Sequence, residues 1–244
     1  MPNSTIPPDS WADENHLLAS LPPAIRALWL PHLELVDLKL GQILYEAQGS
    51  LTHVYFPLTA IVSLLYVLKS GSSAEIAVVG NDGMVGFSLV MGGNTALTRA
   101  VVHSSGVAFR MEAQFMKHEF NLMPPVMHLM LRFIQALTTQ MAQTAVCNRH
   151  HSLDQQLCRW LLLSLDRVRS NELIMTQELI ANMLGVRREG VTEGATQLQL
   201  AGLIKYARGH ITVLDRAGLE RRVCECYKVV RREYRRLLPD CIAT

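Results

Sequence analysis

The pattern of hydrophobic positions along the 244-residue chain predicts a strand-rich part followed by a helical part. Between Leu33 and Met111, clusters of Gly, Ser and Asn separate short apolar runs, which are Val54–Phe56, Ile61–Leu68, Glu75–Val79 and Ala100–His103. Short strands at this spacing are typical of an all-β sandwich or barrel. We therefore predict an N-terminal jelly-roll β-barrel, preceded by a short helix within residues 15–30 that two prolines interrupt.

The pattern predicts a long helix after this part. Residues from Val126 to Cys147 contain no Gly or Pro, and apolar side chains alternate spacings of three and four, at Met127, Met130/Leu131, Ile134, Leu137/Thr138, Met141 and Ala145. That spacing is typical of a coiled-coil seam. A helix of about 22 residues is ~33 Å long, which exceeds what a compact barrel needs. We therefore predict a connector that also forms a dimer; the alternative is a helix that packs only on its own domain.

The segment from Thr176 to Leu198 predicts two short helices joined by a tight turn. Thr176 can cap the first helix, and Gly185 can adopt the positive φ that ends it. A second helix could cross closely at Ala181, with a small core formed by Val191, Ile180, Leu184, Val186 and Leu198. This arrangement is typical of a helix-turn-helix. An αα-hairpin with a glycine turn is the alternative.

Polar residues open the second helix, where a recognition helix reads base edges. The following residues 205–213 predict strand, basic turn and strand, which favours a winged helix-turn-helix whose turn contacts phosphates. The predicted DNA-binding residues are Thr176, Gln177, Arg187, Arg188, Glu189, Thr192, Glu193, Arg208 and His210.

Two glycines, Gly190 and Gly194, lie inside the predicted recognition helix. Each costs about 1 kcal/mol relative to Ala in a helix. Either the backbone approaches another element closely there, or the helix is stably formed only when it is bound to DNA. The sequence leaves both explanations open.

Charge is distributed unevenly along the chain. Residues 1–147 hold 7 Lys and Arg against 10 Asp and Glu, whereas residues 148–244 hold 16 against 11. A net charge of −3 followed by +5 favours a C-terminal part that binds a polyanion, although a solvated helix surface could give the same count. A further basic helix, about Ala217–Leu238, could reach the DNA backbone, pack on the dimer or simply be solvated.

This order of elements resembles the Crp–Fnr family of bacterial transcription regulators over roughly residues 20–215. The most specific stretch is MTQELIANMLGVRREGVT, residues 175–192, in which Arg188 and Glu189 match the family's Arg-Glu pair. Gly190 replaces the family's usual Thr, and Glu193 stands where a third base-reading residue, often Arg, occurs. The resemblance implies a cytoplasmic homodimer that binds double-stranded DNA and acts with RNA polymerase, with an altered half-site preference.

The resemblance also implies a division of this α+β chain into four parts. We expect a cyclic-nucleotide-binding-like sensor domain at 15–118 and a connector and dimerisation helix at 119–150. A winged helix-turn-helix at 151–216 and a basic C-terminal helix and tail at 217–244 complete the chain.

The sensor domain departs from the family members that bind cyclic nucleotides. Those members use a Gly-Glu-x-Gly turn and an Arg-Ser pair, whereas this chain has Gly83-Met84-Val85-Gly86 and Ala96-Leu97 in the corresponding places. A cyclic phosphate without its Arg would lose a charge-assisted contact. We therefore expect no cyclic-nucleotide binding of the usual kind at these six residues, and the effector stays open.

The five cysteines indicate no metal site. None lies in the first 146 residues, where the family's iron–sulfur sensors carry theirs, and Cys224 and Cys226 on a helix would point to different faces. His150 and His151 with Asp154 could form a metal site, but adjacent histidines face opposite ways in regular structure. We expect reduced thiols, no metal and no cofactor, while a haem ligated by one of the scattered histidines stays open.

The sequence contains no G-x-S-x-G, H-E-x-x-H, Walker or paired-carboxylate motif, so we expect no enzyme and no catalytic residues. No apolar run reaches the ~18 residues needed to cross a bilayer, and Met1–Asp13 does not have the pattern of a secretory signal. The sequence therefore predicts a sequence-specific DNA-binding transcription regulator. The alternative is a ligand-binding or scaffolding protein of the same fold with weakened or lost DNA binding.

Overall fold

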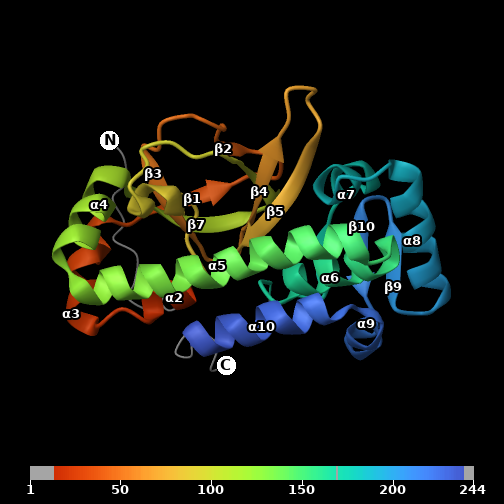
Figure 1. Cartoon of the computed structure of the whole chain (residues 1–244). Helices are drawn as coiled ribbons and strands as arrows, with labels where there is room; N and C mark the ends of the chain where they lie inside the picture. Colours follow the sequence, from red (N-terminus) through yellow and green to blue (C-terminus); the bar gives the residue numbers. More distant parts are fainter. Residues whose placement is uncertain (1–13, 169, 239–244) are drawn as a thin grey trace.

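The computed structural model describes residues 14–168 and 170–238, and Figure 1 shows a sheet-rich part and a helix-turn-helix part along one long helix. Two antiparallel sheets form the first part, with strand orders β1-β7-β3 and β2-β6-β4-β5. Their strands are β1 (Glu34–Leu38), β2 (Ile43–Tyr45), β3 (His53–Pro57), β4 (Ile61–Val67), β5 (Ser73–Val79), β6 (Arg99–Ser104) and β7 (Gly106–Glu112). The predicted sheet-rich N-terminal fold is confirmed.

Buried apolar side chains fill the space between these sheets and the helices around them. Phe56, Ile61, Leu64 and Phe109 are fully buried, as continuous apolar strands predict. The short helices are α2 (His16–Ala19), α3 (Pro23–Trp29), η1 (Leu30–His32), η2 (Phe87–Met91) and α4 (Ala113–Leu122). The interruption expected near Pro22 and Pro23 separates α2 from α3.

The long helix α5 (Pro124–His150) has 27 residues and is longer than predicted at both ends. The first residues of a helix have no intrahelical acceptor for their N–H groups, so proline, which lacks an N–H, is well tolerated at the start of α5. Its predicted seam divides between two faces. Met130, Ile134 and Leu137 are buried in this chain, whereas Leu131, Thr138 and Ala145 are exposed.

The helix-turn-helix part follows a bend at His151. It contains α6 (Leu153–Leu165), β8 (Glu172–Ile174), α7 (Gln177–Leu184), α8 (Arg188–Leu200), β9 (Ile204–Ala207) and β10 (His210–Val213). Ser152 caps α6 in a reciprocal pair with Gln155. The helix ends at Leu165.

The C-terminal region corrects a prediction. The single basic helix expected over residues 217–238 is two helices, α9 (Arg216–Arg222) and α10 (Glu225–Leu237). Val223 and Cys224 have extended backbones between them, because Cys224 forms the N-cap of α10. α10 buries Tyr227, Val230, Tyr234 and Leu237 and packs along α5 (Figure 1). The tail beyond residue 238, including Cys241, lies outside the described residues.

A search of the described helices for a segment with the length and apolar character of a membrane span finds none.

Candidate nucleic-acid interface

The turn between α7 and α8 forms as its sequence predicts. The side chain of Thr176 accepts a hydrogen bond from the Leu179 N–H at 3.2 Å and caps α7. Gly185 ends α7 with φ 67°, a left-handed conformation that favours glycine. The Val186 N–H then donates to the Ala181 carbonyl at 3.0 Å, so the chain reverses tightly into α8.

The two helices share the small core that the sequence predicts. Ile180, Ala181, Leu184, Val191 and Leu198 are all buried. Val186, expected in the same core, is partly buried and packs against its edge. This core fixes the angle between α7 and α8, and so fixes which side of α8 faces outward.

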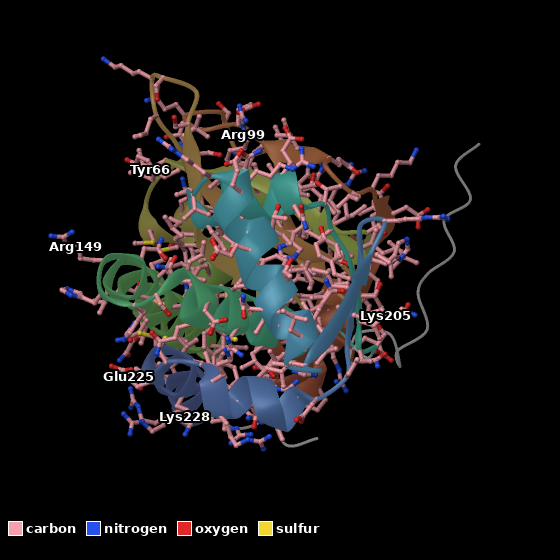
Figure 2. All side chains as sticks on the ribbon, turned by 90° about the vertical axis from the view of Figure 1, so that its right-hand side faces the viewer. Tyr66, Arg99, Arg149, Lys205, Glu225 and Lys228 are labelled. Atoms are coloured by element: carbon pink, nitrogen blue, oxygen red, sulfur yellow. The ribbon has the colours of Figure 1, made fainter. Side chains whose placement is uncertain are left out.

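The outward side of α8 begins with the predicted base-reading residues. Arg187, Arg188, Glu189, Thr192 and Glu193 are all exposed on the first turns of the helix. The Thr192 hydroxyl lies 2.8 Å from Gln177 Oε1 and 3.0 Å from the Arg188 carbonyl, which ties α7 to the start of α8. Figure 2 looks onto α8 with the strands of the wing beside it.

The wing is a three-stranded sheet with the order β8-β10-β9. Arg208 and Gly209 form its tip with positive φ values of 51° and 81°. Arg208 and His210 are exposed there, as predicted. The sequence predicted the two strands β9 and β10 but not β8. That strand has only three residues and one buried side chain, which is too short for an alternating pattern to be recognised.

A groove of about 480 Å³ lies between the helix-turn-helix and the wing. It brings together four predicted residues, Thr176, Gln177, Arg188 and Arg208. Its other members, which were not among the predicted residues, are Glu178, Gln199, Tyr206 and Gly209. Tyr206 could have been recognised as a candidate from the sequence, because it is an aromatic residue within the predicted basic wing.

Tyr206 connects the wing to both α8 and the segment before α7. Its hydroxyl donates to the Met175 carbonyl at 2.8 Å, and its backbone N–H donates to Gln199 Oε1 at 2.8 Å. Burial raises the pKa of Tyr206, while the nearby charge of Arg188 partly opposes that rise. The phenol therefore stays protonated, and two arginines give the groove a positive charge that suits phosphate.

The structure decides between the two explanations for the glycines of α8. A Cβ on Gly190 would lie 2.8 Å from Leu153 Cδ2, and one on Gly194 would lie 3.4 Å from Leu157 Cδ2. Both leucines belong to α6, so the glycines allow α6 to pack closely on the inner face of α8. Close approach of a neighbouring helix therefore accounts for Gly190, whereas a methyl group at position 194 would make an ordinary van der Waals contact with Leu157.

Five of the six predicted ligand-binding residues are buried within the chain. Met84, Val85 and Ala96 are buried, whereas Leu97 is 68% exposed. A Cβ on Gly83 would overlap the Phe133 ring of α5, and Gly86 has φ 98° and packs close to Val54.

Tyr45 lies between the two halves of this region. Burial raises its pKa to about 12, and the neighbouring Thr98 side chain and Gly86 backbone lower it. A buried phenol therefore lies beside both the turn and the segment after Ala96.

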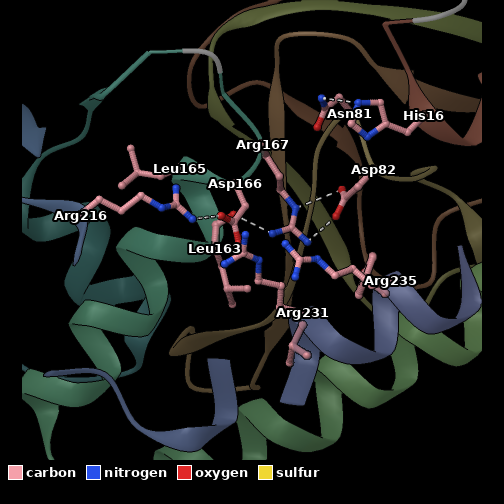
Figure 3. Close-up of a pocket in the computed structure, with 12 residues that line it drawn as sticks. His16, Asn81, Asp82, Leu163, Leu165, Asp166, Arg167, Arg216, Arg231 and Arg235 are labelled. Atoms are coloured by element: carbon pink, nitrogen blue, oxygen red, sulfur yellow. Dashed lines mark hydrogen bonds and ion pairs between the residues drawn. The ribbon is translucent and has the colours of Figure 1, made fainter. Parts of the chain in front are cut away.

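Asp82, in the same turn, connects the sheets to the helix-turn-helix part (Figure 3). Its carboxylate accepts hydrogen bonds from Arg167 Nε at 3.1 Å and from Arg167 Nη2 at 2.7 Å, just after α6. Arg167 also donates to Gln140 of α5 at 3.1 Å, and its guanidinium lies 5.7 Å from the ring centroid of Tyr234. Burial lowers the pKa of Arg167, but the charges of Asp82 and Asp166 and the hydrogen bond to Asp82 are among the effects that together raise it above its usual value, so the ion pair is retained.

The β4–β5 hairpin makes a second contact between the two parts, with α7. Ser63 lies 2.5 Å from Glu75 Oε2, 2.9 Å from His103 Nδ1 and 3.7 Å from Met183 Sδ of α7. His103 stacks on Trp160 of α6 with ring centroids 4.9 Å apart. The helix-turn-helix therefore rests on the sheets by its inner side and leaves the first turns of α8 exposed.

Comparison with known proteins agrees with this arrangement. Residues 155–222 match the family model described as the Crp-like helix-turn-helix domain. FixK2 from Bradyrhizobium japonicum has a similar structure, with a TM-score of 0.65 and 14% identity over 79% of this chain and 98% of that chain. A search of curated protein sequences finds no match.

Two further solved structures share the fold. A CRP family transcriptional regulator from Thermus thermophilus has a TM-score of 0.64 and 20% identity, over 77% of this chain and 95% of that chain. The c-di-GMP responsive global regulator CLP from Xanthomonas campestris has a TM-score of 0.63 and 12% identity, over 80% and 100%. The expected resemblance to Crp–Fnr proteins is confirmed in the fold and in the helix-turn-helix family.

Proposed function

The chain has the fold of a Crp–Fnr-type transcription regulator with a Crp-like helix-turn-helix DNA-binding domain, and from this premise we propose a sequence-specific regulator that binds DNA as a homodimer. The observation that carries the proposal is the two-sided packing of α8. Gly190 lets one side of α8 pack closely against α6, while Arg188 and Glu189 are exposed to solvent on the other side.

The exposed side of α8 has the chemistry of a base-reading surface. Arg188 can donate to guanine O6 and N7, and Glu189 can accept from cytosine N4. Arg208 and His210 extend from the wing toward the flanking phosphates, where contacts add affinity without sequence information. Glu193 has no positive charge to offer a base edge or phosphate, so the preferred half-site differs from one read by Arg at that position.

Homodimer formation is proposed on the exposed side of α5. Leu131, Gln135, Thr138, Ala142 and Val146 recur at spacings of three and four and form one solvent-facing stripe. Within the 27 residues of α5 only Arg132 and Arg149 carry a full charge. A long helix face with so little charge suits a second copy of itself. Two recognition helices would then read half-sites about 34–36 Å apart.

The sensor part is proposed to act without cyclic nucleotide of the usual kind. Met84, Val85 and Ala96 are buried, Tyr45 lies between the two halves of the site, and Asp82 binds Arg167. Such a regulator would act in the cytoplasm on RNA polymerase at nearby promoters. The alternative, a ligand-binding or scaffolding protein, would need no exposed base-reading side on α8.

Selection of bound sequences from random DNA duplexes tests the proposal. Intact protein should enrich a two-fold symmetric site whose half-sites are one helical turn or a multiple of it apart. Sedimentation of the protein with that duplex should give two chains per duplex. Recovery of random sequences without a common site would contradict the proposal and favour the scaffolding alternative.

A further inference from the structure

Three thiols and one imidazole meet where α5 ends and α10 begins. The Sγ atoms of Cys147, Cys224 and Cys226 and one ring nitrogen of His151 all lie within 4.8 Å of one another. Cys147 Sγ is 3.6 Å from Cys224 Sγ, and Cys226 Sγ is 3.6 Å from His151 Nδ1. The three cysteines are buried and His151 is half-buried.

The local backbone explains why these residues meet. Cys147 lies in the last turn of α5, and His151 follows four residues later as its C-cap. Cys224 has φ −72° and ψ 166° as the N-cap of α10, and Cys226 is the second residue of that helix. The expectation that Cys224 and Cys226 point to different faces of one helix is therefore wrong, since only Cys226 lies in the helix.

These distances match a tetrahedral zinc site. With Zn–S about 2.3 Å and Zn–N about 2.0–2.1 Å, neighbouring ligand atoms lie about 3.5–3.8 Å apart. The two distances of 3.6 Å fall in that range. A disulfide would join two of the sulfur atoms at about 2.05 Å and would leave the third thiol and the imidazole unexplained.

The surroundings also suit a metal. His151 Nε2, the ring nitrogen that faces away from Cys226, lies 3.3 Å from Glu225 Oε2. A carboxylate on the second nitrogen of a histidine ligand fixes its ring and tautomer. The N-terminus of α10 places positive partial charge near the thiolates of Cys224 and Cys226.

Arg159 completes the charge balance. Its side chain is buried, donates from Nη1 to the Thr144 hydroxyl at 3.1 Å, and has no hydrogen-bond partner for Nε among the described residues. Burial raises the pKa of the Cys147 thiol to about 11, and the nearby charge of Arg159 opposes that rise. One divalent cation with three thiolates and a neutral imidazole has a net charge of −1, which this guanidinium would neutralise.

We propose that Cys147, His151, Cys224 and Cys226 bind one Zn²⁺ ion in a structural Cys₃His site. The protein fills all four coordination positions, which is typical of a structural zinc site and leaves no place for substrate. Binding converts three thiols to thiolates and releases three protons, with no change of oxidation state.

The metal would bind residues at both ends of the helix-turn-helix part and so hold these two ends together. His151 lies at the bend where the chain enters that part, and Cys224 lies just after α9, where the chain leaves it. Cys147 and Cys224 are 77 residues apart in sequence. The ion would therefore hold α10 on α5 and set the orientation of α8 relative to the proposed dimer helix.

Metal analysis of the intact protein tests the proposal. Protein purified without chelators should contain about one zinc ion per chain by elemental mass spectrometry. Refolding with Co²⁺ in place of zinc should give the intense visible absorption of tetrahedral cobalt with thiolate ligands. Cys226→Ser and His151→Ala should each lose most of the bound metal.

Two matched variants serve as controls. His150→Ala removes the exposed neighbour of His151, and Cys158→Ala removes a buried thiol outside the cluster, so both should keep the metal. Wild-type protein without zinc after exposure to ZnCl₂ would overturn the proposal even if every variant failed to fold. A Cys147–Cys224 disulfide in the native protein, or bound iron in place of zinc, would overturn it as well.

Discussion

The turn at residues 80–86 of the sheet-rich part, called the sensor turn because it belongs to the proposed sensor site, and the first turns of α8 use glycine in the same way but differ in what they expose. Gly83 admits the Phe133 ring, and Gly190 admits Leu153, so each glycine lets a helix pack closely. At the sensor turn the side chains then fill the interior and Asp82 binds Arg167. At α8 the polar side chains remain exposed. The difference indicates that one region serves internal contacts while the other is available to a partner.

The largest effect is expected from breaking the buried ion pair at the sensor turn. Arg167→Ala would leave Asp82 without its partner, and loss of one member of a buried pair costs about 3–5 kcal/mol. We expect a clearly lower urea midpoint of unfolding, measured by circular dichroism. Arg187→Ala, which changes an exposed arginine of the recognition face, should leave the midpoint in place. Equal midpoints for Arg167→Ala and wild type would contradict the assigned role of the turn.

A smaller and selective effect is expected at the recognition face. Arg188→Ala should weaken binding to the selected duplex by about 1–3 kcal/mol and relax the preference at one base pair. Arg208→Ala should instead weaken binding to every sequence and reduce the salt dependence, because the wing is proposed to contact phosphates. Fluorescence anisotropy at several salt concentrations measures both effects.

Arg149→Ala is the matched control for these variants. Arg149 is exposed at the end of α5, on a different side of the molecule from the wing residue Lys205 (Figure 2). Its replacement should change neither the affinity for the duplex nor the salt dependence of binding. A uniform loss across all sequences in Arg188→Ala would make Arg188 a phosphate contact and would contradict its role in base reading.

The glycines of α8 should give a still smaller effect. Gly194→Ala should raise the free energy of unfolding by up to about 1 kcal/mol, because alanine favours the helix and its Cβ fits against Leu157. Gly190→Ala should gain less, since the end of the Leu153 side chain must move. Thermal unfolding of both variants measures the difference. A loss of stability in Gly194→Ala would show that α6 leaves no room for a methyl group.

No effect is expected from cyclic AMP. A ligand that binds the native protein raises its melting temperature, and the filled sensor turn predicts no such rise at millimolar cyclic AMP. The selected duplex should raise the melting temperature in the same assay and serves as the positive control. A rise with cyclic AMP would show that Tyr45 and the turn can open for a nucleotide.

The helix-turn-helix could be predicted closely from the sequence because its rules are local. A cap at Thr176, a left-handed glycine at Gly185 and small or branched residues at Ala181 and Val191 each have one steric purpose within a short segment. The sheet-rich part and the wing were predictable for the same reason, because short apolar runs separated by turn residues are also a local pattern.

Contacts between distant segments could not be predicted in this way. The break before α10 depends on Cys224 acting as an N-cap, and the thiol cluster joins residues 77 positions apart. The pairing of Asp82 with Arg167 spans 85 positions. Nothing in the local pattern of either segment indicates its partner, so spacing alone predicted reduced thiols without a metal and did not predict an ion pair for Asp82.

The central claim is that α8 reads DNA sequence. Its most direct test compares the affinity of the intact protein for the selected duplex with its affinity for a scrambled duplex of equal composition, at physiological salt. The account predicts tighter binding to the selected duplex by about 10³-fold or more. Equal affinities for the two duplexes would contradict it.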